Sequence, residues 1–185
     1  MFPNAVVHSV GDMQIRQRPR NVIKNLRPII IDGQNIAVEH AKQQRKGVHF
    51  SSRGLEICVD YFKKRGHDEI VVFLPRFRHK SGQCDDQSIL NKLENNGNLI
   101  FTPSREVKGR TIASYDDRYV VQYAASNGGV IVSNDNYSDI IHESPEMRQA
   151  IEERLLMFNF VGNVLMLPSD PLGKYGPSLD RFLSF

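Results

Sequence analysis

The stretch Ile29-Ile30-Ile31-Asp32-Gly33-Gln34-Asn35 decides the fold of this chain. Three successive isoleucines are typical of a parallel strand that is buried on both faces. Asp32 stands where such a strand ends, and the glycine after it lets the backbone turn and a ligand approach. Val130-Ile131-Val132 repeats the pattern, with Asp135 just beyond it. Because parallel strands of an open α/β sheet end in one crevice, we expect both aspartates to line that crevice.

The remaining apolar runs alternate between strand and helix periods. They predict strands at 70–74 and 99–101, and helices at about 51–65, 86–95 and 116–126. Strands separated by helices of this length form βαβ units, whose right-handed crossovers place helices on both faces of the sheet. The predicted fold class is α/β, with three α/β/α layers around a central, mostly parallel sheet.

A chain of 185 residues, 40% hydrophobic, fits one domain with a sizeable core. We expect a basic N-terminal arm over 1–25, the main domain over 26–167, and a C-terminal tail over 168–185 that docks on the same domain. Within the domain, 33–50 and 104–114 are predicted to be irregular connections. The runs 155–160 and 164–167 flank Gly162-Asn163 and predict a hairpin at the sheet edge.

The cysteine count and the apolar runs predict the cellular compartment of the chain. Two cysteines, Cys58 and Cys84, cannot build a disulfide framework or a zinc site of three or four thiolates. The sequence shows no secretory signal, and no apolar run reaches the roughly 18 residues that a membrane span needs. We therefore expect a reduced, cytoplasmic protein with no membrane partner, with a nuclear fraction as the alternative location.

A third acidic segment, Asp116-Asp117, opens the helix predicted after a basic loop, and Asp139 lies one helical turn beyond Asp135. Each acid also has a purely structural interpretation: Asp32 as an Asx-turn, Asp116 or Asp117 as a helix N-cap, Asp139 as helix-terminal charge. Several carboxylates at one sheet edge, however, repel one another unless a cation lies among them. An all-oxygen set suits Mg²⁺ or Mn²⁺ and argues against zinc.

Two basic loops indicate the substrate class. Arg105, Lys108 and Arg110 precede the Asp116 segment, and Arg76-Phe77-Arg78-His79-Lys80 follows the second strand at the same carboxyl edge. Phe77 lies between two arginines, where an aromatic ring can stack on a base. Two basic loops beside an acidic metal site predict a polyanion, although solvated loops of scattered charge are the simpler alternative.

Together these segments resemble the NYN/PIN-type ribonuclease domain of the Regnase family (the monocyte chemotactic protein-induced proteins). The resemblance covers about Arg27 to Leu183 and rests on five motifs in order. They are 27–37, Tyr115-Asp116-Asp117-Arg118, Val132-Ser133-Asn134-Asp135-Asn136-Tyr137, Ile151-Glu152-Glu153-Arg154-Leu155-Leu156-Met157, and Asp170-Pro171-Leu172-Gly173-Lys174-Tyr175-Gly176-Pro177-Ser178-Leu179-Asp180.

The resemblance implies a PIN/NYN-like fold and a Mg²⁺-dependent endoribonuclease of single-stranded or stem-loop RNA, typically in messenger 3′ untranslated regions. It also implies a weak head-to-tail homo-oligomer. By motif match, the metal-centred acids are Asp32, Asp117 and Asp135, with Asn35, Asp116 and Asp139 as further catalytic candidates. The implied RNA-binding residues are Arg53, Arg78, Arg105, Lys108, Arg110 and Arg118. Glu106 and Thr111 depart from the basic residues common in the family, which predicts weaker or differently placed RNA contacts.

Two rival functions remain open at this point. A catalytically inactive RNA-binding module would keep the fold and the basic loops, but it has no reason to place acids beside anionic RNA. A small-molecule phosphatase needs an aspartate nucleophile with a second acid two residues on, and Asp32-Gly33-Gln34 followed by Asn35 does not match this pattern. Whether the site holds one metal or two is not fixed by the sequence.

Overall fold

The computed structural model describes residues 25–44, 47–80, 82–107, 110–113 and 116–185, and within 104–116 it defines backbone elements without side-chain surroundings. Lys108 and all but the last residue of the predicted basic arm therefore lie outside the described residues. None of the described helices is long and apolar enough to span a membrane.

A five-stranded parallel sheet organises the domain. Its order is β3 (Leu99–Thr102), β2 (Ile70–Pro75), β1 (Ile29–Asp32), β6 (Val130–Val132) and β7 (Leu155–Leu156). Because β1 is central, it pairs on both sides: Ile31 is in register with Val72 of β2 and with Val132 of β6. The strand ends of β1 and β6 are therefore neighbours.

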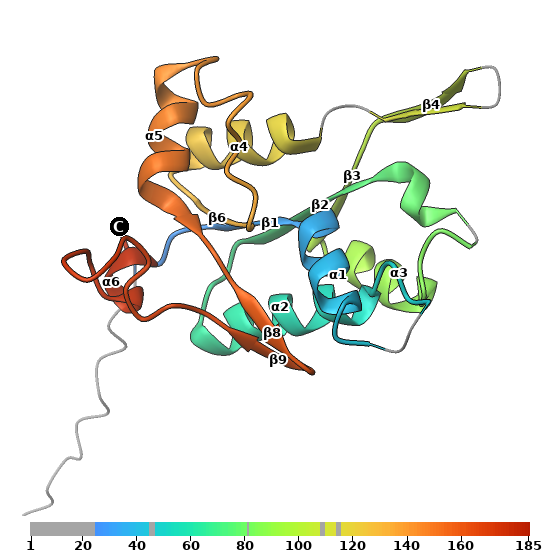
Figure 1. Ribbon diagram of the computed structural model, residues 1–185, viewed down its shortest axis with the longest axis horizontal. Coiled ribbons are helices and arrows are strands. Elements are labelled where there is room, and N and C mark those ends of the chain that lie inside the picture. Colours follow the sequence, from blue (N-terminus) through green and yellow to red (C-terminus); the bar gives the residue numbers. More distant parts are fainter. Residues whose placement is uncertain (1–24, 45–46, 81, 108–109, 114–115) are drawn as a thin grey trace, which may run out of the picture.

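Helices cover both faces of this sheet, as Figure 1 shows. One face carries α1 (Gly33–Ala41), α2 (Ser52–Arg65) and α3 (Gln87–Asn95); the other carries α4 (Asp116–Asn127) and α5 (Pro145–Arg154). Ile29 and Ile31 belong to the core beneath α2, whereas Ile30 belongs to the core beneath α4 and α5, and all three are fully buried. The predicted three-layer α/β/α fold is confirmed.

Two predicted connections were wrong. The segment 33–50 contains α1, because the Asp32 side chain caps the helix by accepting a hydrogen bond from the Asn35 amide. The segment 104–114 contains the antiparallel pair β4 (Ser104–Val107) and β5 (Arg110–Ala113). Its basic residues suggested a loop, but alternation of polar residues with valine and isoleucine also suits a two-stranded ribbon.

The C-terminal hairpin was predicted correctly but misplaced. The strands β8 (Asn159–Val161) and β9 (Val164–Met166) pair around Gly162, which has a positive φ of 56°. They form a separate two-stranded sheet that packs against α1 and α2, and β7 is the edge strand of the main sheet instead. Two short helices complete the structure, the 3₁₀ helix η1 (Arg76–His79) and α6 (Leu179–Phe182).

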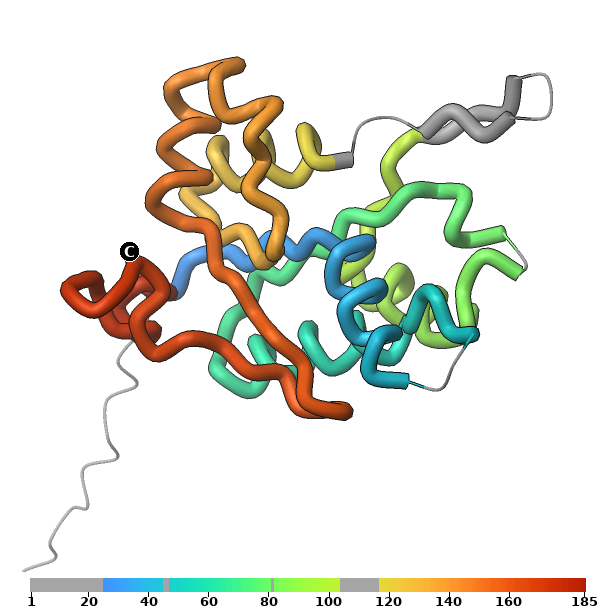
Figure 2. The backbone as a smooth tube through the Cα atoms, viewed as in Figure 1, coloured from blue at the N-terminus to red at the C-terminus, as the bar shows by residue number. Residues whose placement is uncertain are grey.

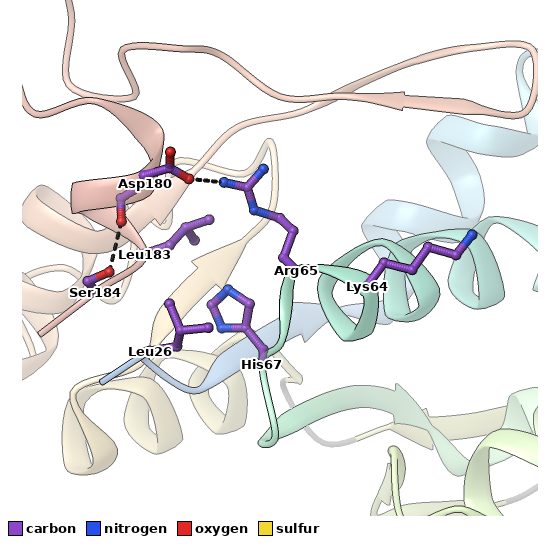
Figure 3. Close-up of a pocket in the computed structure, with 7 residues that line it drawn as sticks. All are labelled: Leu26, Lys64, Arg65, His67, Asp180, Leu183 and Ser184. Carbon is purple, nitrogen blue, oxygen red and sulfur yellow. Dashed lines mark hydrogen bonds and ion pairs between the residues drawn. The ribbon is translucent and has the colours of Figure 1, made fainter. Parts of the chain in front are cut away.

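The chain returns at its end to the start of β1, as the tube in Figure 2 follows. Phe182 and Leu183 are buried, the Arg27 amide donates to the Leu183 carbonyl (2.9 Å), and the Phe185 amide donates to the Asn25 carbonyl (2.9 Å). A hollow of about 450 Å³ lies between this segment and the end of α2, where Arg65 pairs with Asp180 (Figure 3). Leu26 and His67, which precede β1 and β2, line it, so it lies at the amino ends of these strands and not at the ends that carry Asp32 and Asp135.

Candidate active site

The site begins at the end of β1 with Asp32, which is only 6% exposed. Its position follows from local sequence, because Gly33 starts α1 immediately and brings the chain against β2. A Cβ at Gly33 would lie 2.6 Å from the Phe73 carbonyl oxygen, which is closer than any side chain tolerates. Glycine is therefore required for the close approach that turns Asp32 into both a strand end and a helix cap.

Three donors hold the Asp32 carboxylate. The Asn35 amide donates to Oδ1 (3.0 Å), the Ser133 hydroxyl donates to Oδ2 (2.8 Å), and the Tyr137 hydroxyl lies 3.3 Å from Oδ2. A carboxylate has about four lone-pair positions, so these bonds leave one of them free on Oδ1. Asp32 thus satisfies a backbone donor, as the structural interpretation predicted, but as the N-cap of α1 rather than in an Asx-turn, and this role is compatible with a further ligand.

Hydrogen bonds through Ser133 and Asn35 also link the segment after β6 to the end of β1. The Asp135 amide donates to Ser133 Oγ (3.1 Å), and Asp135 Oδ1 accepts from the Tyr137 amide (2.8 Å). The Asn134 amide donates to Asn35 Oδ1 (3.0 Å). The structure therefore brings together Asp32, Asn35 and the Asp135 segment, which are about a hundred residues apart in sequence.

Electrostatics adds Asp117, at the first turn of α4, to this group. The pKa of Asp32 is raised to about 6 by burial and, to a smaller extent, by the charge of Asp117, against hydrogen bonds from Asn35 and Ser133 that lower it. Burial and the charge of Asp135 likewise raise the pKa of Asp117. The charge of Asp117 thus acts on Asp32, and the charge of Asp135 acts on Asp117; a bound cation would relieve this repulsion between like charges.

The other two acidic candidates are less closely defined. Asp116 is the first residue of α4, and its side-chain surroundings lie outside the described part of the chain. Asp139 is exposed in a turn over 138–142, so it is not one helical turn beyond Asp135 as the sequence predicted.

The donors that gather here are all oxygen atoms, which is the ligand set that Mg²⁺ and Mn²⁺ prefer. Within the described residues, no group of three or more acidic, histidine or cysteine side chains is arranged so that it could hold a metal ion by itself. Mg²⁺ does not need such a group, because it keeps several waters and is usually held by one or two carboxylates together with substrate phosphate oxygens. The oxygen chemistry of Asp32, Asp117 and Asp135 fits such a cation, which these residues would hold.

The basic residues that the sequence predicted to bind RNA differ in burial and in the partners that they contact. Arg78 of η1 is half-buried between the rings of Phe50 and Phe77 (4.7 and 4.8 Å) and donates to Gln34 Oε1 (3.0 Å), so it also supports the start of α1. Burial lowers the pKa of its guanidinium.

Two further arginines are already paired. Arg53 is bound to Glu56, and Arg118 makes a two-pronged contact with Glu143 (2.9 and 2.5 Å). RNA phosphates would compete with these carboxylates. Arg105 and Arg110 lie on β4 and β5, where their side-chain surroundings are outside the described part, as is all of Lys108.

Sequence reasoning did not single out Ser133, Asn134 and Tyr137. All three lie within the quoted motif 132–137, but a serine, an amide and a tyrosine near a strand end carry no chemical signature of their own. Only the contact of this segment with the end of β1 shows that Ser133 and Tyr137 hold Asp32, and that Asn134 links Asn35 to the Phe158 amide.

Known proteins share this arrangement of sequence and fold. A Caenorhabditis elegans protein, endoribonuclease rege-1, is 43% identical over 164 residues, which is 86% of this chain and 25% of the relative. The chain thus spans about a quarter of that protein's length.

Similar folds occur in solved structures of the Arabidopsis thaliana nuclear protein-only RNase P 2. One has a TM-score of 0.57 at 24% identity, covering 80% of this chain and 31% of that protein. A second has a TM-score of 0.56 at 25% identity, covering 76% and 29%. Residues 25–181 match the family described as the Zc3h12a-like ribonuclease NYN domain, as the resemblance to the Regnase family predicted. The chain therefore belongs to the Zc3h12a-like ribonuclease NYN domain family.

Proposed function

We propose that this domain is a divalent-metal-dependent endoribonuclease that cleaves single-stranded or stem-loop RNA, with Mg²⁺ as its cofactor and messenger RNA in the cytoplasm as its substrate. The observation that carries the proposal is that Ser133 joins Asp32 at the end of β1 to the Asp135 segment beyond β6, through its hydroxyl bond to Asp32 and the bond that it accepts from the Asp135 amide. The charge of Asp117, at the first turn of α4, contributes to the raised pKa of Asp32, after the larger effect of burial. The family and the name of the relative, an endoribonuclease, support the reaction class.

The residues divide the work as follows. A bound cation would activate a water molecule and stabilise the charge that develops on the scissile phosphate. Asp117 and Asp135 would hold it directly or through water, and Asp32, which accepts a hydrogen bond from Ser133, would complete the negative site. Asn35, whose Oδ1 accepts from the Asn134 amide, and Asp139 would orient the attacking water or an outer water.

The proposal is tested by cleavage of an end-labelled stem-loop RNA, with Mg²⁺ or EDTA, by wild type and Asp135→Asn. We expect Mg²⁺-dependent internal cutting, and a loss of about 10³-fold or more in the variant, because a metal contact contributes several kcal/mol to transition-state stabilisation. Asp60→Asn, an exposed acid on the far side of α2, is the matched control. RNA binding without cutting in both Mg²⁺ and Mn²⁺ would favour the inactive binding module instead.

RNA binding by the β4–β5 ribbon has its own test. We expect Lys108→Glu or Arg110→Glu to weaken binding of single-stranded RNA and to reduce the slope of log affinity against log salt by roughly 0.7 for each lost phosphate contact. Filter binding at salt concentrations from about 50 to about 200 mM measures this slope. If both variants keep the wild-type slope, the ribbon does not belong to the binding surface.

A further inference from the structure

Tyr137 adopts a backbone conformation that needs an explanation. Its φ is +51°, and it alone among the described non-glycine residues has a positive φ. For a bulky aromatic residue this left-handed conformation is strained, and such strain persists where the surroundings impose it. The side chain is nevertheless fully buried rather than turned to solvent.

The conformation lets one residue contact two acids at once. The Tyr137 amide donates to Asp135 Oδ1 (2.8 Å), while the side chain reaches back so that its hydroxyl lies 3.3 Å from Asp32 Oδ2. Its carbonyl accepts from the amides of Ile140 and Ile141, which fixes the turn that follows. Tyr137 therefore spans the gap between the end of β1 and the end of β6.

Packing alone does not account for the hydroxyl. The ring belongs to the core beneath α4 and α5, where phenylalanine would fill nearly the same volume. The hydroxyl instead shares Asp32 Oδ2 with the Ser133 hydroxyl, so that Oδ2 is occupied by two donors and Oδ1 keeps a free lone pair.

We infer that Tyr137 is a positioning residue for the divalent cation: it fixes the Asp32 carboxylate relative to Asp135 before the cation binds. The inference deepens the proposed function and rests on it. Groups that hydrogen-bond to ligating carboxylates orient them, and their loss typically weakens metal binding or activity by about 10–100-fold. The role belongs to the hydroxyl, so it is separable from the packing of the ring.

Mn²⁺ binding to the RNA-free domain tests this without relying on activity. Titration calorimetry should show about tenfold weaker Mn²⁺ affinity for Tyr137→Phe than for wild type. Tyr123→Phe is the matched control: its hydroxyl donates to Glu69 (3.0 Å) on the same side of the sheet, and its loss should leave Mn²⁺ affinity unchanged. Thermal unfolding in EDTA establishes that both variants are folded.

Steady-state cleavage adds a second readout. At limiting Mg²⁺, Tyr137→Phe should lower kcat with an unchanged KM for RNA, and higher Mg²⁺ should recover much of the loss; a change in stability alone would not produce this pattern. Mn²⁺ affinity within twofold of wild type, in a folded Tyr137→Phe, would overturn the inference and leave the proposed function standing. A wild-type domain that neither binds Mn²⁺ nor cuts RNA would overturn both.

Discussion

The carboxyl and amino ends of the central strands carry different kinds of charged residue. At the carboxyl ends, Asp32, Asp117 and Asp135 gather like charges, and the pKa values of the first two are raised. At the amino ends, Arg27 donates to the carbonyls of Ser184 (2.9 Å) and Gly128 (2.8 Å) and stacks on Phe185. The acids at the carboxyl ends raise one another's pKa values. At the amino ends Arg27 and Arg154 also repel each other, but both donate to backbone carbonyls, and the bonds of Arg27 join the C-terminal segment to the sheet.

The difference separates function from stability within one small sheet. A group of ionised acids destabilises the folded chain in the absence of a ligand, so the remaining packing has to hold it in place. The amino ends contribute part of that stability through backbone and arginine hydrogen bonds. Substitutions at the two ends should accordingly have opposite effects: at the acidic end they change activity and relieve repulsion, and at the other they change stability alone.

The largest expected effect concerns the stability of the acidic end against pH. Because the pKa of Asp32 is raised from 3.8 to about 6, the folded state binds more protons than the unfolded state between these pH values. Stability in EDTA should thus be fully present below pH 4 and fall as pH rises through 6, by on the order of 3 kcal/mol from this group.

Urea unfolding in EDTA from pH 4.5 to 8 measures this effect. Asp32→Asn should remove that part of the pH dependence, and saturating Mn²⁺ should stabilise wild type more at pH 7.5 than at pH 5, since the acids must be ionised to bind it. An identical pH profile for wild type and Asp32→Asn would show that Asp32 ionises normally, and the comparison between the two ends would lose its basis.

A smaller effect is expected at the amino end. Arg27→Ala removes two charge-assisted hydrogen bonds to backbone carbonyls, which should lower the free energy of unfolding by about 2 kcal/mol. Arg27→Lys, which keeps the charge but not the forked geometry, should recover only part of it. The midpoint of urea unfolding gives the result, and cleavage per folded molecule should stay at the wild-type level. A selective loss of cleavage in Arg27→Ala would mean that the two ends are coupled.

The smallest effect concerns the ion pair between Arg65 and Asp180 at the hollow in Figure 3. The Asp180 side chain is 87% exposed, so the pair is well solvated. Asp180→Asn should change the free energy of unfolding by less than about 1 kcal/mol. The change should vanish in about 1 M salt, because the salt screens the interaction between exposed charges. A larger, salt-independent loss would show that the tail is held at Asp180 rather than by Phe182 and Leu183.

Particular residues show which parts of the fold and of the site could be predicted from the sequence. Ile29-Ile30-Ile31 predicted a strand buried on both faces, and the structure divides these isoleucines between two cores. The placement of Asp32 and Asp135 at one edge of the sheet followed from parallel topology, since the carboxyl ends of parallel strands meet there. That β1 and β6 are adjacent strands is shown only by the structure. The helix α1 was missed because its start depends on Gly33 fitting against Phe73, a contact that periodicity does not show.

The sequence by itself determined the fold class, the family and the acidic character of the site, because these depend on apolar period and on residue types that motifs carry. The tertiary structure alone decided how the acids are held. Ser133 and Tyr137 bond to Asp32 across about a hundred residues, and Arg53 and Arg118 are engaged by Glu56 and Glu143. Such partnerships depend on which side chains the folded chain brings within about 3 Å of one another, and that distance is not encoded in local sequence.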